Sequence, residues 1–220
     1  MNVWILASGS AANALVIESA GETLLVDCGL GPRTLATRMR AVGIAPESVS
    51  GVAITHEAFD VMGLHISHDA AEPMALVVTC RESGARVAVA TDIGEITQTT
   101  LDAFANVDAL VLESNHCAHM LASGPYPAFL KQRVAAPTGH LSNADCGTAL
   151  TALVHRGLSH IVLAHLSRVN NSPDVARDSA SNALRRAGWR GQLAVAGPNG
   201  LASAFVVGAS VAATRQLEFS

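Results

Sequence analysis

Short apolar runs separated by polar turns fill the first half of the chain, a pattern typical of β-strands. The predicted strands are Val3–Ala7, Ala14–Glu18, Thr23–Asp27, Val52–Thr55, Gly63–Ser67, Met74–Cys80, Arg86–Thr91 and Val107–Glu113. A single helix is predicted among them, because Arg33–Val42 has apolar residues at helical spacing and Gly43 follows as a stop signal.

The second half of the chain alternates between predicted helices and strands. Prolines and glycines between Asn115 and Asn143 indicate a loop-rich region, with a helical turn over Ala128–Arg133. Beyond it we expect helices and strands in this order: helix Ala144–Arg156, strand His160–Ala164, helix Pro173–Ala187, strand Gln192–Ala196, and a closing pair at Ala204–Val207 and Val211–Phe219. Mixed strands followed by this alternation favour a layered α/β architecture with helices outside two packed sheets.

Length and composition set the broad class of the protein. With 220 residues, half of them hydrophobic and 15% charged, the chain is predicted to form a single domain over residues 1–220. No apolar run approaches the roughly 18 residues of a membrane span, and the first segment lacks the basic region of a secretion signal. We therefore predict a soluble, cytoplasmic protein with no membrane partner.

Charge and cysteine usage add little to this class. The formal net charge of −4 gives no general attraction to nucleic acid. It does not exclude nucleic acid as a substrate, because an acidic protein can carry a local basic cleft. Cys28, Cys80, Cys117 and Cys146 lack the spacing of a zinc knuckle, so we expect buried thiols rather than ligands or disulfides.

Several apolar runs end in His, Asp or Ser, and these ends carry the candidate chemistry. Strands that end in imidazoles and carboxylates are typical of metal sites, since the strand fixes the backbone while the side chain projects into a cleft. The signatures are Ser8-Gly9-Ser10, Val26-Asp27-Cys28-Gly29, Thr55-His56-Glu57, Ser67-His68-Asp69, Ala90-Thr91-Asp92-Ile93-Gly94 and Ala164-His165-Leu166-Ser167. Each His or Asp alone could instead be a turn or cap residue.

The signatures resemble a known family when they are taken in order. Together with Leu112-Glu113-Ser114-Asn115-His116, Gly124-Pro125-Tyr126-Pro127 and Gly139-His140-Leu141-Ser142-Asn143, they resemble the YycJ/WalJ-like branch of the metallo-β-lactamase-fold hydrolases, from Ser8 to about Asn171. The resemblance implies an αββα sandwich with a two-metal cleft at the sheet edges. It also implies phosphodiester hydrolysis, with nucleic acid as the leading substrate and a 5′ exonuclease-like activity.

The family pattern assigns roles to individual residues. By resemblance, His56, His68 and His165 are metal ligands, Asp92 is the carboxylate that bridges two metals, and Asp27 is a supporting carboxylate that orients the loop and a ligand. Neutral imidazoles and carboxylates are suitable ligands for Zn²⁺ or Mn²⁺, the cofactors that we expect here.

The chain departs from the family at its first histidine motif. Where the family has His-x-His-x-Asp-His, this sequence has His56-Glu57-Ala58-Phe59-Asp60-Val61. In one interpretation the motif is aligned in place and Asp60 keeps its role as a ligand. In the other, which we favour, a segment is missing after Glu57 and the fold is shortened there. Ala58–Ser67 then belongs to the strands before His68, and Asp60 is a turn residue.

Either interpretation leaves too few ligands for two complete metal sites. We expect His68, Asp92 and His165 to hold one metal, with His56 as a contributor to the other, and we expect weak, partial or no occupancy of the incomplete site. Impaired metal binding would lower the activity of this chain.

The loop-rich middle supplies the remaining candidates. His116 and His140 could protonate the leaving oxygen, contact a phosphate or hold the loops together, and with Asp92 they are the predicted catalytic residues. The predicted substrate-binding residues are Asn115, Ser142, Asn143, Lys131 and Arg168. The 4% aromatic content argues against an extended base-stacking platform.

Three functions therefore compete at this stage. The first is a metal-dependent phosphodiesterase, most simply a nuclease. The second is a non-catalytic protein of the same fold, and the third is a hydrolase of small phosphodiesters or lactones, since a fold does not fix the substrate.

Overall fold

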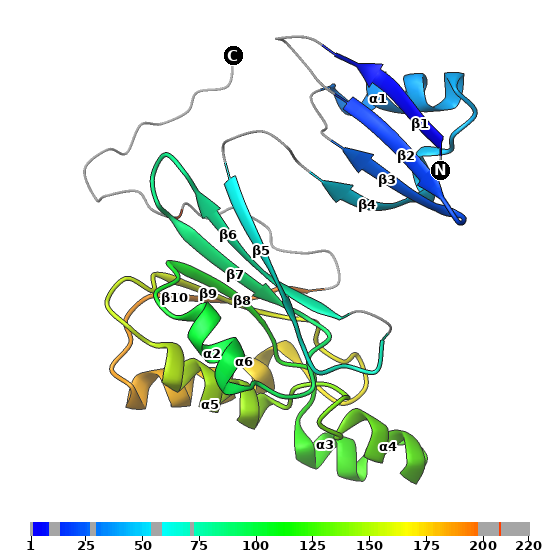
Figure 1. The fold of residues 1–220 in the computed structure, drawn as a ribbon. Helices are drawn as coiled ribbons and strands as arrows, with labels where there is room; N and C mark the ends of the chain where they lie inside the picture. The colour runs from blue at the N-terminus through cyan, green and yellow to red at the C-terminus, as the bar shows by residue number, and fades with distance from the viewer. Residues whose placement is uncertain are drawn as a thin grey trace. The chain divides into compact units, whose positions relative to one another are not determined.

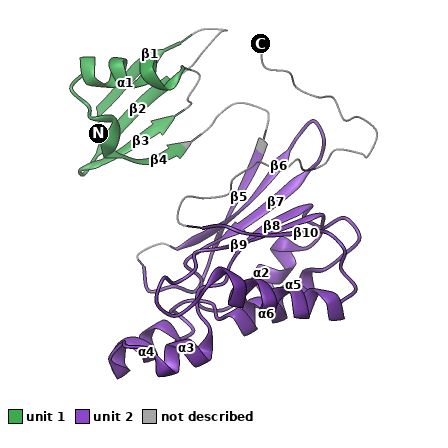
Figure 2. Cartoon of the chain, turned by 180° about the vertical axis from the view of Figure 1, so that it is seen from behind, with its two compact units in different colours: residues 1–57 green, residues 58–220 purple. Residues whose placement is uncertain are grey.

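The protein is described by a computed structural model over residues 2–8, 14–26, 30–53, 59–70, 73–197 and 207. The chain divides into two compact units, residues 1–57 and 58–220 (Figure 2). Each unit has its own sheet and its own buried core. The single domain over residues 1–220 stays a prediction.

The first unit is a four-stranded sheet with one helix on its face (Figure 1). Its strands are β1 (Asn2–Ala7), β2 (Ala14–Ser19), β3 (Glu22–Val26) and β4 (Val49–Ala53), in that spatial order. Helix α1 (Pro32–Ala41) and a 3₁₀ turn, η1 (Pro46–Ser48), connect β3 to its parallel neighbour β4. Val16, Leu25 and Met39 are buried between sheet and helix.

The second unit is built on a six-stranded mixed sheet in the order β10-β9-β8-β7-β6-β5. Its strands are β5 (Phe59–His65), β6 (Met74–Cys80), β7 (Arg86–Ala90), β8 (Ala109–Glu113), β9 (His160–Ala164) and β10 (Gln192–Val195). Strands β7 to β10 are parallel, whereas β5 and β6 are antiparallel to their neighbours. The carboxyl ends of β7, β8 and β9 therefore lie at the same edge, where parallel sheets usually place their ligands.

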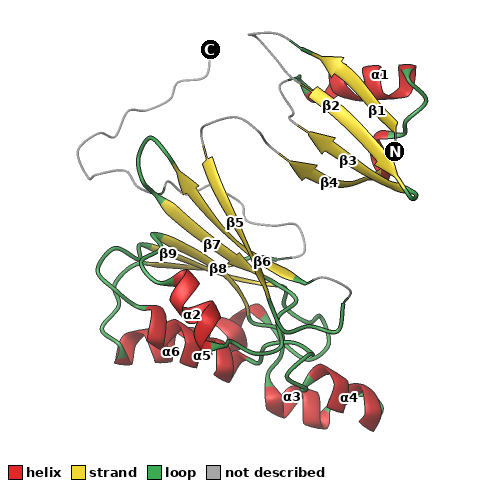
Figure 3. Ribbon diagram, viewed as in Figure 1, coloured by secondary structure: helices red, strands yellow, loops and turns green. Residues whose placement is uncertain are grey.

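Helices cover one face of this sheet (Figure 3). They are α2 (Gln98–Phe104), α5 (Asn143–Leu153) and α6 (Pro173–Arg186), whereas α3 (Ala118–Ser123) and α4 (Ala128–Val134) belong to the loop-rich segment. Phe104, Leu112, Leu150 and Ile161 are fully buried where helices and sheet meet. No described helix is long and apolar enough to cross a bilayer.

Most predicted elements are confirmed, with shifts at their ends. Met74–Cys80 and His160–Ala164 match the observed strands residue for residue, whereas β5 begins at Phe59 rather than Gly63. Helices α2 and α3 were not predicted. The predicted closing pair lies outside the described residues except for Val207, which is not in a strand. Sheets of mixed direction with flanking helices confirm the α/β class.

The cysteine prediction is confirmed in part. Cys80, Cys117 and Cys146 are free thiols, and Cys28 lies outside the described residues. Cys146 is buried as expected, whereas Cys80 and Cys117 are partly exposed.

Candidate metal centre

Three side chains from the ends of neighbouring parallel strands form the centre of the site. Asp92 comes two residues after β7, Glu113 ends β8, and His165 comes directly after β9. His68 follows β5, and His140 lies in the loop before α5. Segments far apart in sequence therefore supply one cluster of imidazoles and carboxylates.

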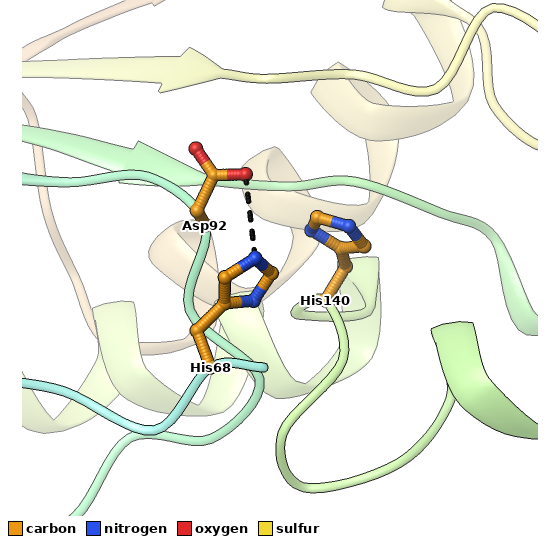
Figure 4. Close-up of side chains that lie close together, drawn as sticks. All are labelled: His68, Asp92 and His140. Carbon is orange, nitrogen blue, oxygen red and sulfur yellow. Dashed lines mark ion pairs between the residues drawn. The ribbon is translucent and has the colours of Figure 1, made fainter. Parts of the chain in front are cut away.

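Asp92 lies between two imidazoles without touching either. Its Oδ1 is 3.8 Å from Nε2 of His68 and 3.6 Å from Nε2 of His165 (the first contact is drawn in Figure 4). These distances are too long for hydrogen bonds. Two atoms that both bind a Zn²⁺ ion, each about 2.0–2.2 Å away, can be up to about 4.3 Å apart. The spacing therefore suits a cation between Asp92 and each histidine.

The structure groups the candidate ligands differently from the sequence prediction. Among the described residues, two sets have ligand atoms all within 4.8 Å of one another: His68, Asp92 and His140, and Glu113, His140 and His165. The set predicted for one metal, His68, Asp92 and His165, is not among them. Asp92 is nevertheless within 4 Å of both His68 and His165. That these three residues hold one ion stays a prediction.

Glu113 is the residue that the sequence analysis left without a role. Its side chain is fully buried, its Oε1 accepts hydrogen bonds from Nδ1 of His140 (2.8 Å) and His165 (2.7 Å), and its Oε2 accepts one from the backbone N–H of Ile93 (2.7 Å). A histidine that donates from Nδ1 presents a free lone pair at Nε2. Glu113 therefore orients two imidazoles toward the cluster rather than serving as a ligand itself.

Hydrogen bonding also sets the charge of this carboxylate. Burial alone would raise the pKa of Glu113, but the hydrogen bonds from His140, His165 and the Ile93 N–H outweigh it and hold the pKa below its ordinary value. The same bond to Glu113 raises the pKa of His165, with burial opposing it and Asp92 adding to it. The pair thus consists of an ionised carboxylate and a histidine of increased basicity, as in the carboxylate–histidine pairs that support metal ions.

His68 is oriented by a backbone carbonyl. Its Nδ1 lies 2.8 Å from the carbonyl oxygen of Gly139 and donates to it, so Nε2 is directed at Asp92. The Ser67 hydroxyl donates to the carbonyl of Pro137, and the Gly94 N–H donates to the carbonyl of Ser67. Three loops, those bearing His68, Asp92 and His140, are therefore tied together.

Asp92 and His165 adopt an uncommon backbone conformation. Their φ angles are +56° and +54°, in the left-handed region that non-glycine residues rarely occupy. Such residues cost of order 1–3 kcal/mol each and concentrate at functional sites. Sequence patterns do not reveal this feature.

His116 lies beside the cluster in a closed environment. It is 3% exposed, and its Nδ1 is buried with no hydrogen-bond partner among the described residues. Burial, reinforced by the nearby His140, lowers its pKa, so the imidazole is neutral at pH 7. His116 and His140 line one cavity of about 490 Å³.

The predicted substrate-binding residues of the loops are engaged in internal contacts. The Asn115 amide donates to the carbonyl of His165. The buried Asn143 amide accepts from the Ser114 hydroxyl and exchanges hydrogen bonds with the Asn171 amide. Ser142 caps α5 by accepting from the N–H of Asp145. These bonds hold the loops around the site, and substrate contact by these residues stays a prediction.

The two predicted cationic contacts differ in their surroundings. The Lys131 ammonium donates to the carbonyl of Ala122, 2.6 Å away. Arg168 lines a second cavity, of about 580 Å³, whose wall includes His165. Arg168 therefore shares a cavity with a candidate ligand.

Three further predicted residues do not join the cluster in the described structure. Asp60 lies in β5 and forms an ion pair with Arg81 at 2.6 Å. Five residues of strand, roughly 17 Å, separate it from His65, which itself precedes His68, so the structure does not bring Asp60 to the site. His56 and Asp27 lie outside the described residues.

The chain is similar to proteins of the metallo-beta-lactamase superfamily. Residues 7–63 match the model of the metallo-beta-lactamase superfamily. The chain is 28% identical to the exodeoxyribonuclease YycJ of Bacillus anthracis, covering 84% of this chain and 89% of the relative. It is 25% identical to the exodeoxyribonuclease WalJ of Streptococcus pneumoniae serotype 2, covering 83% and 88%. Among solved structures, the metallo-beta-lactamase fold protein YhfI of Bacillus subtilis matches at a TM-score of 0.49 and 16% identity, covering 90% of this chain and 97% of that one.

The alignment to YycJ is 238 positions long, more than the 220 residues of this chain. It therefore contains positions where the relative has residues and this chain has none. That agrees with a shortened chain and does not locate the missing segment.

Proposed function

We propose that this chain, which is similar to YycJ and WalJ and to the metallo-beta-lactamase superfamily, is a metal-dependent phosphodiesterase that degrades nucleic acid from an end. The observation that carries the proposal is the placement of Asp92 between Nε2 of His68 and Nε2 of His165. Two relatives named exodeoxyribonucleases support nucleic acid as the substrate.

The donor set fits a divalent cation. Asp92 offers a half-exposed carboxylate, while His68 and His165 each have Nδ1 bound elsewhere and Nε2 directed at that carboxylate. These residues would hold Zn²⁺ or Mn²⁺, which would supply positive charge to the phosphodiester and activate water for attack.

His140 is proposed as the proton donor to the leaving oxygen. Its ring lies 5.0 Å from that of His68 and 5.2 Å from that of His165, measured between centroids, so it borders both sides of the cluster. Glu113 accepts from its Nδ1 and fixes the orientation of the ring, so Nε2 remains available to substrate.

Arg168 is proposed to contact a phosphate of the strand. It shares its cavity with His165 and with Ser172, which caps the N-terminus of α6 by accepting from the Val175 N–H. A guanidinium beside a helix N-terminus favours an anion. Lys131, Asn115, Ser142 and Asn143 are the other proposed contributors to substrate binding.

A non-catalytic protein of the same fold is the second candidate. The observation in its favour is the sequence His56-Glu57-Ala58-Phe59-Asp60-Val61, which lacks two of the three histidines of the family motif. Weak occupancy of one metal position would follow from that loss.

Metal analysis combined with two substrates separates these functions. The purified protein is assayed for Zn and Mn, then for hydrolysis of bis(p-nitrophenyl) phosphate and of a 5′-labelled DNA duplex with added Mn²⁺. Bound metal and cleavage of both substrates are expected. Neither metal nor turnover would favour the non-catalytic protein, and cleavage of the small ester alone would favour a small-molecule phosphodiesterase. The variant His119→Ala, on the exposed surface of α3, serves as a control that should behave as wild type.

A further inference from the structure

A cavity of about 490 Å³ lies directly behind His140. Its apolar wall includes Ile96, Leu101 and Ala149, and its polar wall includes His116, His140 and Ser142. The volume falls in the range of small-molecule sites, roughly 300–1,000 Å³. Since His140 also borders His68 and His165, a group in this cavity would be one imidazole away from the candidate metal cluster.

The charge of the lining argues against a phosphate in this cavity. Glu95 and Asp145 contribute to the wall, and its described lining includes no Lys or Arg. The cavity beside His165 has the opposite character, because Arg168 lines it. An anion is therefore expected on the Arg168 side, and an uncharged group with hydrogen-bond donors on the His140 side.

His116 supplies an unfulfilled polar contact at this wall. Its side chain is 3% exposed, and its Nδ1 has no partner among the described residues. A buried nitrogen of this kind ordinarily has a hydrogen-bond partner, which costs of order 1–3 kcal/mol to omit. His116 lines the cavity, and a planar ligand with polar edges that reached this nitrogen would provide the partner.

We propose that this cavity receives the base of the nucleotide next to the scissile phosphodiester, an inference that rests on the proposed function. A nucleobase is planar and uncharged, has apolar faces for Ile96, Leu101 and Ala149, and has polar edges for His116 and Ser142. A single cavity holds one base, which agrees with a chain too poor in aromatic residues for an extended stacking platform.

The test combines a protein variant with a smaller cavity and a substrate that lacks the terminal base. Ala152 lines the cavity near the end of α5, and Ala144, exposed in the same helix, does not, so Ala152→Leu and Ala144→Leu form a matched pair. Each protein cleaves a labelled oligonucleotide and a second one that is abasic at the terminal nucleotide.

Wild type and Ala144→Leu are expected to cleave the base-bearing strand roughly tenfold or more faster than the abasic strand. Ala152→Leu should cleave the two strands at similar rates. The proposal is overturned if wild type does not distinguish the strands, or if Ala152→Leu slows both strands equally and keeps their ratio.

Binding decides the question without catalysis. Calorimetry in EDTA compares the affinity of wild type for a base-bearing dinucleotide and for its abasic analogue. Tighter binding of the base-bearing form, lost in Ala152→Leu, supports the cavity as a base site even if no phosphodiester is hydrolysed. Equal binding of both forms would overturn the inference while leaving the proposed hydrolysis to its own assay.

Discussion

Two carboxylates on neighbouring parallel strands share one imidazole partner, His165, and have opposite surroundings. Asp92, after β7, has a 47% exposed side chain and lies 3.6–3.8 Å from two imidazoles. Glu113, at the end of β8, is 0% exposed and lies 2.7–2.8 Å from two imidazoles. His165 faces both, with Nε2 toward Asp92 and Nδ1 toward Glu113. The gaps around Asp92 leave room for an ion, whereas the closed contacts of Glu113 fix how the imidazoles face it.

The largest effect is expected from Asp92→Asn, which removes the negative charge of the half-exposed carboxylate. Loss of a supporting partner typically costs 10–100-fold in metal affinity, so loss of the central ligand should cost more than about 100-fold. Calorimetric titration with Mn²⁺ and Zn²⁺ measures the affinity. Thermal unfolding with and without metal provides a second measure, because a bound ligand stabilises the folded state.

The comparison would fail if Asp92→Asn bound metal as wild type does. Unfolding of the variant without metal should match that of wild type, since the half-exposed side chain contributes no closed contact. A strongly destabilised variant would mean that Asp92 is a structural residue and not a ligand.

Glu113→Gln tests the closed side and should have the next largest effect. An amide cannot accept from both His140 and His165 while also accepting from the Ile93 N–H, so at least one buried donor loses its partner. We expect a 10–100-fold loss of metal affinity and a loss of about 1–3 kcal/mol in the free energy of unfolding. Chemical denaturation and metal titration measure the two effects separately. A loss of stability with unchanged metal affinity would remove Glu113 from the site.

The difference between the two carboxylates also shows what a sequence can predict here. Asp92, His68 and His165 are predicted as ligands because each follows an apolar run and matches a position of the family pattern. Glu113 closes a strand in the same way, but its role depends on burial and on which imidazole nitrogens face it. Neither can be derived from spacing along the chain.

The same limit explains the elements that were missed. Helix α2 begins with Gln98 and two threonines, which have low helix propensity. Its N-cap, Thr97, is evident only from the hydrogen bond that its side chain accepts from the Thr100 N–H. Helix α3 has six residues, too few to show a periodic pattern. Asp60 is a ligand in one interpretation of the motif and a turn residue in the other, but pairing with β6 places it within a strand and beside Arg81.

Gly94→Ala would disturb both carboxylates through the backbone, with a smaller effect. A Cβ at Gly94 would lie 2.1 Å from the carbonyl oxygen of Pro137 and 2.8 Å from the Gly139 nitrogen, in the loop that leads to His140. Because backbone atoms cannot yield as a flexible side chain does, we expect a loss of about 1–3 kcal/mol, or roughly 2–10 °C in the unfolding temperature. Gly84→Ala, with open space around its Cβ but a positive φ, controls for strain in the backbone alone. Equal effects of the two substitutions would exclude the clash as the cause.

The smallest effect is expected from thiol labelling, which tests whether the interior beside Glu113 is closed. Burial, with the charge of Glu113 adding to it, raises the pKa of the Cys146 thiol to about 12. Hydrogen bonds from Ser83 and from the Glu82 backbone lower the pKa of the Cys80 thiol. A thiol with a pKa near 12 is about one part in ten thousand thiolate at pH 8, and the thiolate is the reactive form.

Iodoacetamide at pH 8 should therefore alkylate Cys80 and leave Cys146 unmodified in the folded protein, as measured by peptide mass spectrometry. Because unfolding in denaturant exposes both thiols, equal labelling there verifies the reagent. Equal labelling of the folded protein would show that solvent reaches the Glu113 side, and the distinction between an open and a closed carboxylate would be lost.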